Sequence, residues 1–168
     1  MFDQRVLELA EELVTRATGL GMWITTAESC TGGLIAGALT SVSGASSCVG
    51  SGFVTYSNDA KMDALGVSFD SLEKYGAVSE EVAREMAHGA RKTARADLAL
   101  AVTGIAGPLC GTIEKPVGLV FIVAAGGTDP GKIVVERHEF GNIGRSEVRI
   151  ATVVAALELG LRSLHISS

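Results

Sequence analysis

The sequence is poor in aromatic residues, proline and cysteine. Aromatic residues make up 5% of its 168 positions, and it has only three prolines and three cysteines, Cys30, Cys48 and Cys110. The cysteines lie far apart, with no Cys-x-x-Cys pair and no neighbouring histidine, which argues against a disulfide framework and a zinc site. We therefore expect small free thiols in a reducing cytosol, no bound metal and a cytoplasmic protein.

Positive charge and long apolar runs are also scarce. The formal net charge is −5, which argues against broad nucleic-acid binding, although a local pair of arginines can still bind a small anion. No apolar run is long enough to span a bilayer, and the charged, amphipathic N-terminus does not read as a signal peptide. We expect neither nucleic acid nor a membrane as a partner.

What the chain does contain is 47% hydrophobic residues, mostly small aliphatic ones, in segments of helix and strand length. The predicted helices are residues 3–19, 33–41, 80–96 and 144–164, with a short helical piece within 57–64. The predicted strands are residues 22–27, 48–56, 98–103, 119–125 and 132–140, with a bend or bulge at Gly50 or Gly52. Helices before and after near-continuous apolar strands predict a three-layer α/β/α sandwich. We expect one domain over 1–168, with a mostly parallel or mixed sheet of about five strands.

A first polar cluster, Glu28-Ser29-Cys30-Thr31-Gly32-Gly33, joins a predicted strand to a predicted helix. One interpretation is an ordinary helix cap, because Ser and Thr are preferred at that position. The other is a presented nucleophile, since Ser29 would lie near free backbone N–H groups that can hold an oxyanion. The local sequence is compatible with both.

A base for Ser29 has to come from elsewhere in the chain. The cluster is neither Gly-x-Ser-x-Gly nor Ser-x-x-Lys, and the three histidines fall on predicted surface positions. The second polar cluster, residues 55–61, offers Lys61, which acts as a base only if desolvation or a nearby cation lowers its pKa. Tyr56, at the end of a strand, could orient it.

A third cluster, residues 103–118, is a glycine-rich loop whose backbone amides can face a ligand. It lacks the Gly-Lys-Ser/Thr ending of a P-loop. Arg145 and Arg149 lie four residues apart at the start of the last predicted helix, where their guanidinium groups suit a phosphate or a carboxylate.

Together these clusters resemble the CinA C-terminal domain family, whose stand-alone members are nicotinamide-nucleotide amidases. The matching stretches cover about residues 5–164 and are "AESCTGG" (27–33), "VTYSNDAK" (54–61), "GAVS" (76–79), "TGIAGP" (103–108), "GTIEKPVG" (111–118) and the Phe140, Gly141, Arg145, Arg149 series.

The resemblance implies a stand-alone enzyme that converts nicotinamide mononucleotide to nicotinic acid mononucleotide and ammonia, without a cofactor. It implies Ser29 as nucleophile and Lys61 as general base, with Tyr56 positioning Lys61 or the amide. The expected substrate contacts are Thr31, Gly32, Gly33, Thr103, Gly104, Gly107 and Arg145. Similar proteins are often dimers, so we expect a homodimer.

The sequence departs from the family pattern at one place that could affect substrate specificity. Similar proteins usually carry Asp-Gly after the Gly-Pro of the third cluster, where this chain has Leu109-Cys110. Two alternatives therefore remain at this stage: a non-catalytic module that binds nucleotide or phosphate, and an enzyme in which Cys30 is the nucleophile, activated by a helix N-terminus.

Overall fold

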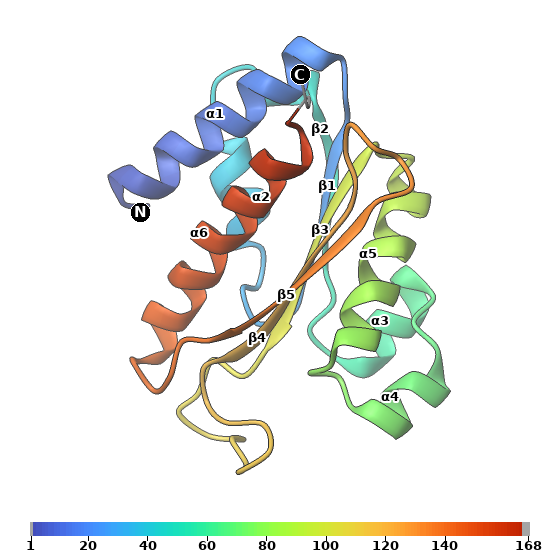
Figure 1. Cartoon of the computed structure of the whole chain (residues 1–168), viewed down its shortest axis with the longest axis vertical. Coiled ribbons are helices and arrows are strands. Elements are labelled where there is room, and N and C mark those ends of the chain that lie inside the picture. The colour runs from blue at the N-terminus through green and yellow to red at the C-terminus, as the bar shows by residue number, and fades with distance from the viewer. Residues whose placement is uncertain (1, 166–168) are drawn as a thin grey trace.

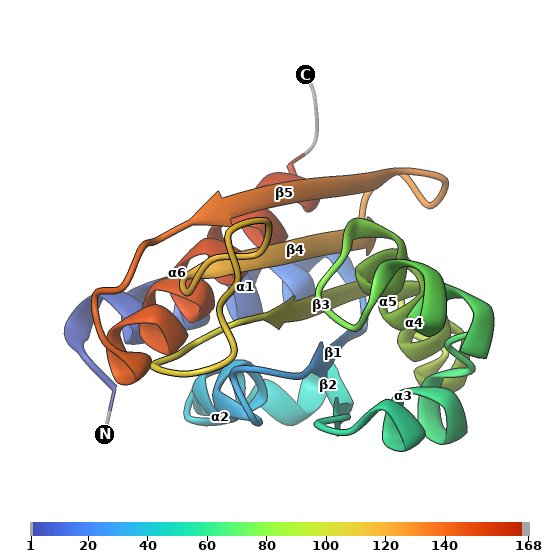
Figure 2. The same cartoon turned by 90° about the horizontal axis from the view of Figure 1, so that it is seen from below.

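The apolar segments of the chain form a five-stranded sheet that is covered by helices on both faces (Figures 1 and 2). The computed structural model describes residues 2–165. The strands are β1 (Ile24–Glu28), β2 (Val49–Val54), β3 (Leu98–Gly104), β4 (Leu119–Gly126) and β5 (Ile133–Glu139). Their order is β2-β1-β3-β4-β5, with β1 parallel to β2 and β3, and β4 antiparallel to β3 and β5. The predicted three-layer fold with a mixed sheet is confirmed.

The helices divide into two layers. One layer consists of α1 (Gln4–Leu20), α2 (Leu34–Thr40) and α6 (Arg145–Ser163), and the other of α3 (Asn58–Leu65), α4 (Phe69–Tyr75) and α5 (Glu80–Ala94). Figure 1 shows these layers on the left and right of the sheet. Helix α4 is not predicted from the sequence, because its seven residues are too few to establish a helical period.

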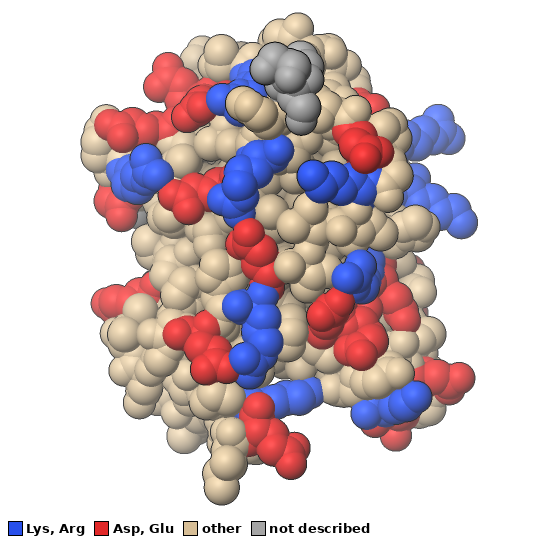
Figure 3. Space-filling model, viewed as in Figure 1, with Lys and Arg blue, Asp and Glu red and all other residues tan. Residues whose placement is uncertain are grey.

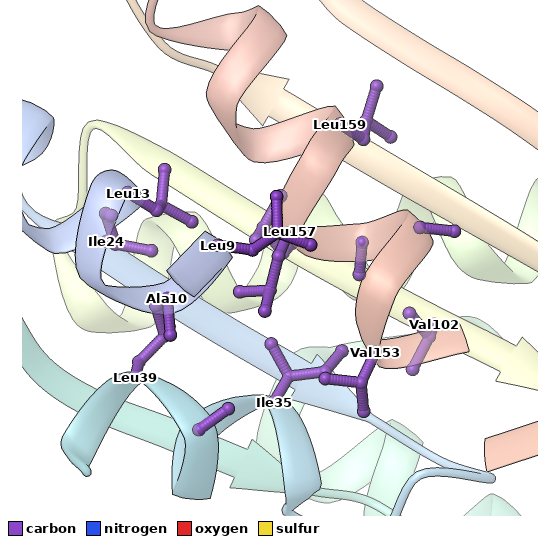
Figure 4. Close-up of a cluster of buried hydrophobic side chains, with 14 of the residues drawn as sticks. Leu9, Ala10, Leu13, Ile24, Ile35, Leu39, Val102, Val153, Leu157 and Leu159 are labelled. Carbon is purple, nitrogen blue, oxygen red and sulfur yellow. The ribbon is translucent and has the colours of Figure 1, made fainter. Parts of the chain in front are cut away.

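Each face of the sheet has its own hydrophobic core, and β3 contributes to both. Leu98, Leu100 and Val102 pack with α1, α2 and α6, whereas Ala99 and Ala101 pack with α5. Figure 4 shows part of the first core, in which side chains of α1, α2 and α6 meet. This alternation follows from the strand period of two. The alanine side of the strand allows α5 to lie close to the sheet.

The pairing of β1 with β2 contains one irregularity. Ile24 pairs with Val49 but Thr25 pairs with Ser51, so Gly50 is an extra residue on β2. The predicted bend or bulge is confirmed at this glycine. Beyond it the register is regular, and Glu28 lies opposite Val54 at the carboxyl ends of the two strands.

Gly89 of α5 allows α3 to pack directly on α5. A Cβ atom there would lie 1.8 Å from the backbone oxygen of Leu65, the last residue of α3. We expect Gly89→Ala to lower the free energy of unfolding by about 1–3 kcal/mol, as overpacked cores do. The intrinsic helix preference for Ala, about 1 kcal/mol, acts in the opposite direction. Urea unfolding of the purified variant measures the difference.

Gly19 of α1 is the matched control, since a Cβ atom there would meet nothing within 4 Å. Gly19→Ala is expected to raise the free energy of unfolding by about 0.5–1 kcal/mol. Equal shifts for the two variants would contradict the close packing of α3 on α5.

The surface carries charge of both signs. Acidic and basic side chains are interspersed over the face shown in Figure 3. Within residues 2–165, the helices are all too short or too polar to cross a membrane.

Candidate active site

The carboxyl ends of the parallel strands β1 and β3 border a pocket of about 380 Å³. In open α/β sheets, ligands characteristically bind at this end of the strands. The pocket brings together Ser29, Tyr56, Lys61 and Arg145, which lie in separate parts of the sequence. The glycine-rich loop after β3 projects at the same end of the molecule (Figure 1) and adds Thr103, Gly104 and Gly107 to the wall.

Ser29 and Lys61 are in direct contact. The Nζ atom of Lys61 lies 3.1 Å from the hydroxyl oxygen of Ser29 and donates to the backbone oxygen of Thr55 at 2.8 Å. Ser57 caps α3 by accepting from the N–H of Ala60, so α3 begins just after β2 and turns Lys61 inward. The Ser29 hydroxyl and the Lys61 amine are therefore held within hydrogen-bond distance of each other at the pocket.

Lys61 is buried to an unusual degree for a lysine, with only 1% of its surface exposed. Within residues 2–165 it forms no ion pair with a carboxylate. Burial lowers the pKa of the Lys61 ammonium group below its ordinary value, because the charged form loses its water. The neutral amine, once formed, can accept a proton from Ser29 while one of its N–H groups still bonds Thr55.

Neither Ser29 nor Thr31 caps the helix that follows them. The residue at the N-cap position of α2 is Gly33, which provides no side chain, and the carboxylate of Glu28 accepts from the first turn instead. The N–H of Gly32 donates to the backbone oxygen of Ser29, and that of Gly33 to Glu28. Thr31, Gly32 and Gly33 thus lie behind Ser29, outside the residues that line the pocket.

Tyr56 and Arg145 meet at the mouth of the pocket. One guanidinium nitrogen of Arg145 donates to the hydroxyl of Tyr56 at 2.9 Å and another to the backbone oxygen of Gly107, also at 2.9 Å. The Tyr56 side chain is exposed and bonds Arg145 rather than Lys61. Lys61 bonds the backbone carbonyl of Thr55 instead. The sequence does not reveal this contact, because every residue has a backbone carbonyl and none is marked out by its type.

Another part of the pocket wall is held by Thr103, near the end of β3. The hydroxyl of Thr103 donates to the backbone oxygen of Ala77 at 2.8 Å, which holds Ala77 and Val78 at the pocket. Ile105 and Ala106 add further apolar surface. The pocket therefore combines a polar floor at Ser29 and Lys61 with apolar sides.

Cys30 lines the same pocket, but its thiol is a poor nucleophile. Its side chain is almost fully buried, and burial raises the pKa of the Cys30 thiol to about 11. Reactive cysteines instead have a lowered pKa, because the thiolate is the attacking species. The structure thus favours Ser29 over Cys30.

Comparisons with known proteins find a family, a relative and a solved structure that match nearly the whole chain. The family model for the CinA C-terminal domain matches residues 6–164. Nicotinamide-nucleotide amidohydrolase PncC of Enterobacter agglomerans is 47% identical over 162 residues, which are 96% of this chain and 97% of that protein. The crystal structure of the competence/damage inducible protein CihA from Agrobacterium tumefaciens has a TM-score of 0.95 and 50% identity, covering 98% of this chain and 99% of that one.

Some relatives are much longer. A putative competence-damage inducible protein of Acetivibrio thermocellus is 54% identical over 136 residues, which are 81% of this chain but 32% of that protein. The present chain therefore corresponds to about a third of the longer relative.

Proposed function

Because the chain belongs to the CinA C-terminal domain family, we propose that it is an amidohydrolase that converts nicotinamide mononucleotide to nicotinic acid mononucleotide and ammonia. The observation that carries the proposal is the 3.1 Å contact between the Ser29 hydroxyl and the buried amine of Lys61. The 47% identity to a nicotinamide-nucleotide amidohydrolase over nearly the whole chain supports the substrate.

The first half of the reaction forms an ester on Ser29. The serine oxygen attacks the carboxamide carbon while its proton moves to the neutral amine of Lys61. The negative oxygen of the tetrahedral intermediate needs donors, and within the described residues the backbone N–H of Cys30, next to Ser29, donates to no backbone oxygen. The protonated Lys61 then gives its proton to the leaving nitrogen, and ammonia departs.

The second half releases the acid. A water molecule gives one proton to Lys61 as its oxygen attacks the ester carbon, and the ester bond to Ser29 breaks as Lys61 returns that proton to the serine oxygen. Nicotinic acid mononucleotide leaves, and both side chains regain their starting state. No proton acceptor besides Lys61 is required.

The residues that line the pocket support a position for the pyridine ring and one for the phosphate. The pyridine ring would pack between the apolar sides formed by Ala77, Val78, Ile105 and Ala106. The phosphate would lie at the mouth, within reach of Arg145, whose guanidinium group suits a phosphate.

The direct test is a product assay on the purified protein. We expect ammonia and nicotinic acid mononucleotide to form from nicotinamide mononucleotide, in comparison with nicotinamide and NAD as alternative substrates. Tight nucleotide binding in a calorimeter without any acid product would contradict the enzyme and favour the binding module.

Replacing Arg145 tests the place of the phosphate. We expect Arg145→Met to raise KM for nicotinamide mononucleotide about 10- to 100-fold, since a hydrogen bond to a charged group is worth about 1.5–3 kcal/mol. Turnover of nicotinamide riboside, which lacks the phosphate, should change little. The control is Arg84→Met, which removes an exposed arginine of α5 that pairs with Glu80. An unchanged KM for the Arg145 variant would place the phosphate elsewhere.

A further inference from the structure

Glu28 is a fully buried carboxylate directly before Ser29, and the reaction described above gives it no part. One of its oxygens accepts from the Thr31 hydroxyl at 2.7 Å, the Gly33 N–H at 3.1 Å and the Ile35 N–H at 3.0 Å. The other accepts from the Ala36 N–H at 2.8 Å. Buried carboxylates are usually paired with a cation. Within residues 2–165, Glu28 has no such ion pair, so four neutral donors hold its charge.

Glu28 accepts hydrogen bonds from the first turn of α2, as an N-cap side chain usually does. The free N–H groups of a first helical turn are commonly bonded by a Ser, Thr, Asp or Asn at the N-cap. In α2 they are bonded by a carboxylate that reaches over from the end of β1, where its negative charge also suits the helix dipole. The Ser29 hydroxyl is thereby left free to contact Lys61.

Arg149 holds the opposite side of the same loop. Its Nε donates to the backbone oxygen of Cys30 at 3.1 Å, and one Nη donates to that of Thr31 at 2.9 Å. Gly32 gives the guanidinium group room, because a Cβ atom there would lie 3.3 Å from it. The loop is thus fixed through its donors by Glu28 and through its carbonyls by Arg149.

We propose that Glu28 is a positioning residue for the reaction, and that together with Arg149 it fixes residues 29–33 so that the Ser29 hydroxyl points at Lys61. The proposal rests on the proposed function for the identity of the nucleophile. It assigns Glu28 no contact with the substrate. A carboxylate that only stabilised the fold would affect the melting temperature. Loss of a positioning Glu28 should instead lower kcat, with little effect on substrate binding.

Glu85 provides a matched control. It also accepts several hydrogen bonds at the start of a helix, from the backbone N–H and hydroxyl of Ser68 and from the hydroxyl of Ser71. Glu85 belongs to α5, and its carboxylate contacts the start of α4, outside the residues that line the pocket. Glu85→Gln therefore disturbs a helix start without disturbing the loop that carries Ser29.

The experiment compares Glu28→Gln with Glu85→Gln for kcat, KM and melting temperature on nicotinamide mononucleotide. We expect Glu28→Gln to lower kcat about 100-fold, the effect of a small misplacement of a reacting group, and to change KM less than about threefold. Glu85→Gln should keep both within about twofold. A wild-type kcat in Glu28→Gln, or a loss confined to KM, would overturn the proposal.

Two milder variants cover the case in which Glu28→Gln does not fold. Thr31→Val removes one donor to Glu28 at constant shape, and Arg149→Lys replaces the rigid guanidinium fork that bonds both carbonyl groups of the loop by a flexible ammonium group. Each is expected to lower kcat about 10-fold at an unchanged melting temperature. Wild-type kcat in both would overturn the proposal.

A second readout separates the positioning of Ser29 from the identity of the substrate. A fluorophosphonate labels an activated serine without any nucleotide, so the labelling rate at Ser29 reports its orientation alone. We expect Glu28→Gln to lower this rate about 100-fold, like kcat. If wild type is labelled but does not hydrolyse the nucleotide, the proposed substrate fails while a slow Glu28→Gln still supports positioning. Labelling of Glu28→Gln at the wild-type rate overturns the positioning role.

Discussion

Ser29→Ala is expected to reduce ammonia release from nicotinamide mononucleotide at least about 1000-fold, because the remaining pocket can bind the amide but cannot form the ester. The side chain lies at the floor of the pocket, and its loss leaves Lys61 bonded to the Thr55 carbonyl. The variant should therefore fold normally. Steady-state assays at saturating nucleotide, with the melting temperature measured beside them, check both statements.

Cys30→Ala is the control for this variant, because Cys30 is the other nucleophile in the pocket. Its raised pKa of about 11 keeps the thiol protonated near neutral pH, so most activity should survive its removal. Robust turnover by Ser29→Ala, together with loss of activity in Cys30→Ala, would assign the nucleophile to the thiol.

Replacing Lys61 should also remove activity, because Ser29 then loses the group that accepts its proton. We expect Lys61→Met and Lys61→Arg both to lower kcat by about 100- to 10,000-fold, the range found for general acid–base groups. The arginine keeps the positive charge but cannot give up its proton near neutral pH. Lys92→Met, which removes an exposed lysine of α5, should have no effect. An active Lys61→Arg variant would show that the site needs a charge and not a base.

The pH dependence of the wild type follows from the lowered pKa of Lys61. Only the neutral amine can accept the Ser29 proton, so kcat/KM should rise with pH as Lys61 loses its proton, at a pH below the ordinary lysine value. A profile without this limb would contradict Lys61 as the base.

Lys61 should also make stability depend on pH, because its pKa is lower in the folded chain than in the unfolded chain. The folded chain binds the Lys61 proton more weakly than the unfolded chain does, so unfolding takes up a proton between the two pKa values. The free energy of unfolding therefore rises as pH increases through that window, up to about 10.4. Lys61→Met should remove this dependence and unfold at the wild-type temperature or above it.

Much of the fold could be predicted because it follows from local pattern. The apolar runs of β3 and β4 and the start of α5 at Glu80 lie where the sequence places them. The site is harder to predict, because the burial of Lys61 and the contacts of Glu28 depend on the folded structure and cannot be deduced from residue type. In the sequence Lys61 looks like an ordinary surface lysine, and it becomes buried only once the fold brings it against Ser29 and Thr55. Glu28 stands in the sequence as one polar residue of a junction, and its role depends on the turn that brings α2 back over it.

The extra residue at Gly50 has a consequence for how the length of the chain can vary. A residue gained or lost between α2 and β2 can be absorbed at this irregularity, while the pairing of Glu28 with Val54 is preserved. The segment from Thr55 to Lys61 cannot change length in this way. Lys61 lies six positions after Thr55, and its amine donates to the Thr55 carbonyl, so an added or lost residue would break this hydrogen bond. We therefore expect an engineered one-residue insertion before β2 to be tolerated, and one between Thr55 and Lys61 to move the amine away from Ser29.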